Sequence, residues 1–275
     1  IGVGGSGQHI IHAYLRVLAL GNAGAVEVPH VYIIDADAQS QQIANRRSQL
    51  VPDIQSLHEY LRHRGIDNKT REANFDIIRP YSQSLSSSSE LTVKNVLLAQ
   101  KSKTTEEIQA FFYEKDLNIK VSEGMHANPK VGSTIFGEKL GRVLDGSGKV
   151  NTANKALLQQ EFLSLFDDDV TGINTAGCNI VIVGSVFGGT GSGIIPTLAR
   201  TFNEIINSSG SGSTVNLATV ATLPWFQLKP GEDGSTGSAF DTGKLKRNTA
   251  FALRNFQHEL QSNSNNAVSS IFIQS

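Results

Sequence analysis

Hydrophobic and polar positions along the chain predict strands that alternate with helices. Short, continuous apolar runs are typical of strands buried on both faces of a parallel sheet. These runs lie at 28–34, 178–183, 214–222 and 268–273. Apolar residues that recur every three or four positions predict helices at 8–20, 131–144, 154–166, 194–207 and 244–260. The alternation indicates an α/β fold, in which a Rossmann-like parallel sheet carries helices on both faces.

One long segment departs from this alternation. Residues 40–124 are largely polar and follow a helical pattern, with no apolar run that we expect to form a strand. The segment contains two small groups of apolar positions, near Leu57 and near Phe111, that could form the buried faces of helices. We therefore expect helices there rather than further strands of the sheet.

Composition narrows the class of protein. Hydrophobic residues make up 39% of the chain and charged residues 18%, which is typical of a globular domain. The 24 Lys and Arg balance 25 Asp and Glu, which argues against a generally basic surface for nucleic acid. The single cysteine, Cys178, excludes an intramolecular disulfide framework and fits a reducing compartment, so we expect a cytoplasmic protein. No apolar run approaches the roughly 20 residues of a membrane span.

The first glycine-rich segment, GVGGSG at 2–7, precedes a predicted helix. Glycines let a backbone approach a phosphate closely, and a helix start offers free N–H groups at the positive end of its dipole. With Asp35 at the end of the second strand as a ribose acid, the segment fits a dinucleotide-binding fingerprint. A tight turn without a ligand is the alternative.

The second glycine-rich segment, GGTGSG at 188–193, lies between an apolar strand and a helix. Its four glycines are not favoured for stability, because each costs about 0.5–1 kcal/mol relative to alanine. The hydroxyls of Thr190 and Ser192 add donors to the backbone amides, as in an anion nest for a di- or triphosphate. The segment is not a Walker loop, because no lysine follows the glycines. We expect Gly191→Val to remove phosphate binding with a modest loss of folding.

Together these motifs resemble the tubulin/FtsZ superfamily. GGTGSG resembles its signature loop GGGTG(S/T)G, and GVGGSG resembles the first phosphate loop of FtsZ. DADAQ at 35–39 resembles NTDAQ, and ANPKVG at 127–132 resembles ANPEIG, the loop that senses the terminal phosphate. VATLPW at 220–225 resembles the VVTKPF strand and turn. The motifs occur in the same order as in the family, and the stretch between DADAQ and ANPKVG, longer than in FtsZ, makes the chain resemble a divergent bacterial tubulin-like protein. Because both glycine-rich segments follow apolar strands of one parallel sheet, we expect them at the same carboxyl edge.

The resemblance implies a site for GTP or GDP, with Mg²⁺ accompanying the triphosphate. The residues that it assigns to nucleotide binding are Gly4, Gly5, Ser6, Gly7, Gln8, Asp35, Asp37, Ala127, Asn128, Phe187, Gly188, Gly189, Thr190, Gly191, Ser192, Gly193, Pro224, Asp241 and Arg247. Phe187 replaces the first glycine of the signature. Arg247 stands one position out of register with the family's phosphate-binding arginine, and Asp241 stands near the position of its glutamate.

The resemblance also implies how the protein is organised. Residues 1–275 correspond to the GTP-binding domain, with a helical insertion at about 41–124 that offers a surface for protein partners. The C-terminal activation domain of the family is expected to lie outside this chain. In the family, subunits stack head to tail, and an acidic loop of the next subunit completes hydrolysis. We therefore expect filaments, and little GTP turnover by these 275 residues alone.

Other classes of protein share some of these features. A ubiquitin-activating-type (ThiF-like) adenylating enzyme also has a GxGGxG loop and an acid after the second strand, and NRRSQ at 45–49 is similar to its NxxRQ. That class leaves ANPKVG and GGTGSG unexplained and needs paired zinc cysteines. An NAD-dependent dehydrogenase lacks a recognisable catalytic set here. A tubulin-like protein that binds nucleotide without polymerising remains open.

Overall fold

The computed structural model contains a six-stranded parallel sheet. The residues that it describes are 1–19, 31–35, 52, 55, 56, 59, 60, 62, 63, 75–78, 91–99, 110–121, 124–143, 179–208, 216–224, 242–262 and 268–274. In chain order the strands are β1 (Gly2–Val3), β2 (Val31–Ile34), β3 (Phe75–Ile78), β4 (Asn179–Ser185), β5 (Asn216–Thr222) and β6 (Val268–Gln274). Their order in the sheet is β3-β2-β1-β4-β5-β6, and every neighbouring pair is parallel. This arrangement confirms the predicted Rossmann-like sheet.

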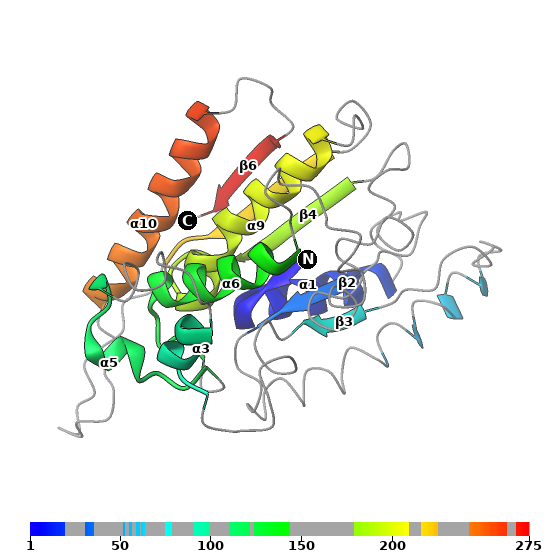
Figure 1. Ribbon diagram of the computed structural model, residues 1–275. Helices are drawn as coiled ribbons and strands as arrows, with labels where there is room; N and C mark the ends of the chain where they lie inside the picture. Colours follow the sequence, from blue (N-terminus) through cyan, green and yellow to red (C-terminus); the bar gives the residue numbers. More distant parts are fainter. Residues whose placement is uncertain are drawn as a thin grey trace.

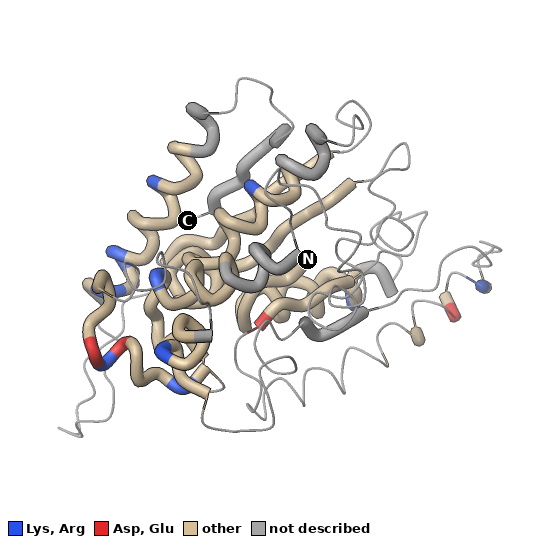
Figure 2. Tube along the Cα trace, viewed as in Figure 1, with Lys and Arg blue, Asp and Glu red and all other residues tan. Residues whose placement is uncertain are grey.

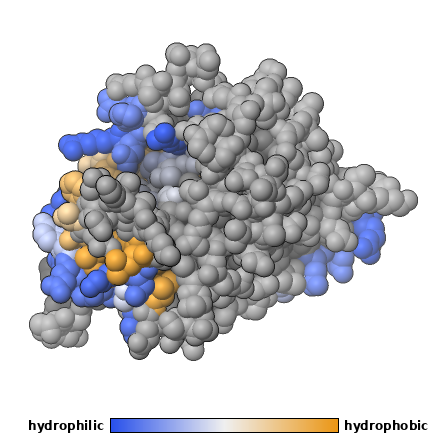
Figure 3. Space-filling model, viewed as in Figure 1, coloured by the Kyte–Doolittle hydropathy of each residue, from blue (hydrophilic) through white to orange (hydrophobic). Residues whose placement is uncertain are grey.

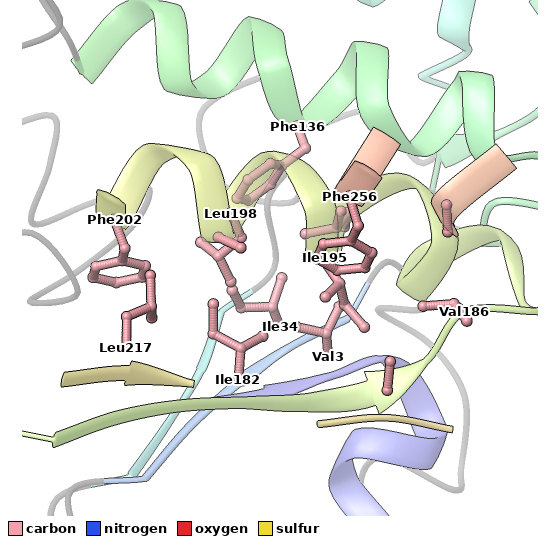
Figure 4. Close-up of a cluster of buried hydrophobic side chains, with 14 of the residues drawn as sticks. Val3, Ile34, Phe136, Ile182, Val186, Ile195, Leu198, Phe202, Leu217 and Phe256 are labelled. Atoms are coloured by element: carbon pink, nitrogen blue, oxygen red, sulfur yellow. The ribbon is translucent and has the colours of Figure 1, made fainter. Parts of the chain in front are cut away.

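Helices cover both faces of this sheet (Figure 1). Helix α1 (Gly4–Ala19) packs on one face, against β1, β2 and β4. Helix α9 (Gly189–Ser208) packs on the opposite face, and α10 (Thr242–Ser262) lies beside it (Figure 4). Helix α6 (Pro129–Val143) forms an outer layer against α9, with the short helices α3 (Val93–Ala99) and α5 (Glu114–Leu117) nearby.

The main core lies between α9 and the sheet. Figure 4 shows Ile195, Leu198 and Phe202 of α9 above Ile182 and Leu217 of the strands. These side chains are all buried, and burial of each large one stabilises the fold by roughly 1.5–3 kcal/mol. A second buried cluster joins α3 to α6; its members include Val93, Leu97, Ile119, Val131 and Ile135. The two clusters hold the start of α6 against the start of α9.

The strand order reverses between β1 and β4. From β1 the chain proceeds through β2 to β3 at one edge, and it returns to β4 on the other side of β1. Val3 pairs with Gly184, so the carboxyl ends of β1 and β4 lie next to each other. In doubly wound α/β proteins, ligands bind in the crevice outside the strand ends at such a reversal.

Three sequence predictions need correction. Helices α1 and α9 begin at Gly4 and Gly189, four or five residues earlier than predicted, so most of each glycine-rich segment is a first helical turn. The purely helical prediction for 40–124 is wrong at Phe75–Ile78, which forms the edge strand β3. That strand is only four residues long and has polar flanks, so the pattern around it obscured it. The predicted helix at 154–166 lies outside the described residues.

Candidate functional site

The first turns of α1 and α9 meet at the carboxyl ends of β1 and β4. Gly4, which follows β1, has a φ of +68°, a left-handed conformation that favours glycine. A Cβ atom on Gly4 would lie 3.5 Å from the Cβ atom of Thr190 and 3.9 Å from the nitrogen of Gly191. The prediction that both glycine-rich segments share one edge of the sheet is therefore confirmed.

The start of α6 packs against the same turn of α9. A Cβ atom on Gly189 would lie 2.6 Å from the nitrogen of Asn128 and 2.9 Å from the Cα atom of Ala127. A Cβ atom on Gly193 would lie 2.5 Å from the carbonyl oxygen of Pro129. Real Cβ atoms do not approach backbone atoms this closely, so only glycine permits the contact. Three helix N-termini, those of α1, α6 and α9, thus converge at the switch point.

The turn before α6 has an unusual backbone. His126 and Ala127 have φ angles of 47° and 51°, in the left-handed region that residues other than glycine seldom occupy. The nitrogen of Asn128 donates a hydrogen bond to the oxygen of Met125 at 2.7 Å. The side chain of Asn128 then caps α6, because its Oδ1 accepts from the nitrogen of Lys130 at 3.2 Å.

Several of the predicted phosphate-binding glycines pack inside the fold. A Cβ atom on Gly7 would lie 2.6 Å from the carbonyl oxygen of Val183, and one on Gly191 would overlap the carbonyl oxygen of Ser185. The side chain of a valine at 191 would therefore enter the protein interior and not the phosphate volume. The expectation that Gly191→Val causes only a modest loss of folding is therefore wrong. Half-buried residues at this edge of the sheet are Gly5, Ser6, Ala127, Asn128, Phe187, Gly188 and Thr190.

The two hydroxyls of the second segment have different surroundings. Ser192 is fully buried, and its Oγ donates to the carbonyl oxygen of Gly188 within the same turn. The Ser192 hydroxyl therefore has a partner within its own turn, and its donation to a phosphate stays a prediction. Thr190 remains half-buried beside Gly4 and can still donate to a ligand.

A buried polar pair links α1 to the end of β2. The Nε2 of Gln8 donates to Oδ2 of Asp35 at 2.8 Å, and the two side chains are 1% and 7% exposed. The Oε1 of Gln8 is buried and accepts no hydrogen bond in the described part of the structure. An unsatisfied buried acceptor costs roughly 1–3 kcal/mol, so this oxygen is suited to accept a donor from a ligand.

Helix α10 contributes a residue that the sequence analysis missed. The Nδ2 of Asn248 donates to the carbonyl oxygens of Ala127 and Phe187, at 2.9 Å each. Arg247, the predicted contact, is exposed. Asn248 lies on the apolar face of α10 with Leu245 and Ala252, and a single polar residue at such a position was the available signal.

The structure describes only some of the remaining predicted site residues. Pro224 is half-buried just beyond β5, whereas Asp37 and Asp241 lie outside the described residues. Where side chains are described, no group of three or more His, Cys, Asp or Glu could hold a metal ion. No described helix combines the length and the apolar character needed to cross a bilayer.

The fold and this edge define a doubly wound α/β protein with a glycine-lined switch point. A family model described as tubulin like matches residues 1–270. The chain therefore belongs to the tubulin-like family, as the order of its motifs predicted. Searches of curated proteins and of solved structures gave no match.

Proposed function

We propose that this protein binds GTP and GDP at the point where α1, α6 and α9 converge. The observation that carries the proposal is the close packing of their three N-termini at the strand reversal. Each N-terminus carries the positive end of a helix dipole, which favours a negative ligand. A chain of phosphates can span neighbouring N-termini, whereas a single anion would use only one.

The parts of a nucleotide fit different residues of this edge. The phosphates would lie over the turn at Gly188 and Thr190, with the terminal phosphate toward Asn128. The unpartnered Oε1 of Gln8 would accept a hydrogen bond from the ribose or the base. Mg²⁺ would arrive with the triphosphate, since this ion is commonly held by phosphate oxygens, waters and one or two carboxylates.

The charge around this edge suits an anionic ligand. Figure 2 shows Lys and Arg along α10 and at the start of α6, whereas it shows Asp and Glu at α5, at the end of β2 and within residues 52–63. The basic residues of these two helices whose side chains the structure describes are Lys130, Lys244, Lys246, Arg247 and Arg254. Their positive potential would raise the local concentration of a triphosphate.

We further propose head-to-tail assembly, in which a neighbouring subunit completes hydrolysis. Hydrolysis needs an oriented water as well as stabilised charge. The described acid nearest to the strand ends, Asp35, is buried and held by Gln8. An acid from the next subunit would supply the missing group, and a contact of that heterologous kind generates filaments. We place this assembly in the cytoplasm.

The segment around α3 and α5 is proposed to contact protein partners. Leu98, Phe111 and Tyr113 are 54%, 75% and 72% exposed. Figure 3 shows hydrophobic surface on the side of the molecule where α3 and α5 lie. Exposed aromatic side chains are enriched at protein interfaces, so this part of the predicted insertion is a reasonable partner surface.

Calorimetry with GTP, ATP and NAD tests the nucleotide proposal. Wild-type protein should bind GTP most tightly, and Gly188→Asp should abolish binding by placing a negative charge at the phosphates. The matched control is Gly137→Asp, which adds the same charge on α6 where a Cβ atom meets nothing within 4 Å. The control should bind like wild type. Tighter binding of NAD, or adenylate formation from ATP, would contradict the proposal and favour the alternative enzymes.

A further inference from the structure

Helix α10 holds two turns that are far apart in the sequence. Asn248 is 4% exposed, and the two hydrogens of its Nδ2 point to the carbonyl oxygens of Ala127 and Phe187. One of these carbonyls precedes α6, and the other precedes α9. A single side-chain amide therefore fixes the backbone just before both helix N-termini.

The hydrogen bonds also fix the orientation of two peptide groups. In a planar trans peptide, the C=O and the following N–H point in opposite directions. Because the Phe187 carbonyl points to Asn248, the N–H of Gly188 points away from α10. The Ala127–Asn128 peptide is held at both ends, since its N–H donates to Met125 at 2.7 Å. With both carbonyl oxygens turned to α10, neither faces an anion at the helix N-termini.

A second side chain of α10 holds the strained part of the turn before α6. The Nζ of Lys244 donates to the carbonyl oxygen of His126 at 2.7 Å. His126 and Ala127 are the two described non-glycine residues with positive φ, a conformation that persists only when its surroundings fix it. Lys244 and Asn248, one helical turn apart, donate to the carbonyl oxygens of His126 and Ala127 and thus stabilise the left-handed conformation.

We propose that Asn248 is a positioning residue that locks the peptides before α6 and α9 in the orientation that receives a phosphate. Lys244 supports only the turn before α6. This inference rests on the proposed nucleotide site. Without the Asn248 amide, the carbonyl oxygens of Ala127 and Phe187 lose the donor that orients them, and the peptides rotate to find others. A rotated peptide presents its oxygen to the anion.

The test compares Asn248→Asp with Asn255→Asp, which adds the same charge to α10 two turns further on. At pH 8 the new carboxylate of Asn248→Asp offers no hydrogen to either carbonyl. Lys244→Met, at a partly exposed position, serves as a second variant that leaves the core untouched. Each protein is measured without nucleotide by hydrogen–deuterium exchange, and then by its affinity for GTP and for tripolyphosphate.

We expect Asn248→Asp to exchange faster at 124–132 and at 186–189, with unchanged exchange at β5. Lys244→Met should speed exchange at 124–132 alone, and Asn255→Asp at neither segment. The affinity of Asn248→Asp for both GTP and tripolyphosphate should fall by about tenfold or more. A shared loss for the two ligands locates the defect at the phosphates and not at the base.

Unchanged exchange in Asn248→Asp would overturn the inference, and so would faster exchange with wild-type affinity. If Asn248→Asp does not fold, Lys244→Met decides through its effect on 124–132: faster exchange supports the inference and wild-type exchange overturns it. The proposed function fails separately, when the wild-type protein binds neither GTP nor tripolyphosphate. In that case the exchange of the unliganded variants alone decides whether Asn248 positions the two turns.

Discussion

Gly193→Ala tests whether α6 and α9 approach as closely as the site requires. The added Cβ atom would lie 2.5 Å from the oxygen of Pro129 and 2.8 Å from the nitrogen of Ser133, both backbone atoms of α6. To restore a 3.0 Å separation from the Pro129 oxygen, the helices must move apart by at least 0.5 Å. Overpacking of this kind costs typically about 1–3 kcal/mol, and we expect the upper part of that range because neither atom can rotate away.

An alanine inside a helix also adds stability, so the sign of the change in Tm is informative. Replacing glycine by alanine inside a helix stabilises it by roughly 1 kcal/mol. The net destabilisation by Gly193→Ala is then about 1–2 kcal/mol, which lowers the Tm by roughly 2–8 °C for a domain of this size. Gly137→Ala is the control, because a Cβ atom there meets nothing within 4 Å. It should raise the Tm by about 2–4 °C.

Thermal unfolding followed by circular dichroism measures both variants. Gly193→Ala should also bind GTP more weakly, since the start of α6 would be displaced from that of α9. If Gly193→Ala raised the Tm as much as Gly137→Ala, the close approach of the two helices would be refuted. The argument that glycines bring α6 to the phosphate edge would be refuted with it.

Three further predictions address the polar groups and the chemistry. Thr190→Val should weaken GTP binding in calorimetry with no change in Tm. Ser192→Ala should lower the free energy of unfolding by about 1 kcal/mol and retain binding. Lost binding in Ser192→Ala with wild-type binding in Thr190→Val would contradict the roles given to these hydroxyls. Gln8→Glu places a second carboxyl beside buried Asp35, and this raises the pKa of the pair. The variant should therefore be less stable than wild type at pH 7, and urea unfolding should show a smaller difference between the two proteins at pH 5. An equal difference at both pH values would contradict this. Phosphate release from GTP by the full-length protein should rise more than linearly with protein concentration, and strict proportionality would contradict hydrolysis in trans.

The elements around the candidate site show which features local sequence patterns predict. The apolar runs of β4 and β5 and the glycine-rich segments after β1 and β4 were sufficient to predict strands, helices and one shared edge. The short strand β3 escaped detection because four residues in a polar segment carry too little periodicity. The boundaries of α1 and α9 were misjudged because glycine, a poor helix former, occupies their first turns. Here close packing against neighbouring backbone overrides propensity.

By itself, the sequence determined the α/β class, the family and the edge at which the two glycine-rich segments lie, because hydrophobic period and glycine spacing are local properties. Only the tertiary structure decided what each glycine does: Gly189 and Gly193 admit α6, whereas Gly7 and Gly191 admit the backbone of β4. It also decided that Asn248 donates to the carbonyl oxygens just before α6 and α9. The physical reason is that, apart from the contact of Gly191 with Ser185, these roles depend on distances between segments at least sixty residues apart, and residue order alone does not specify such distances.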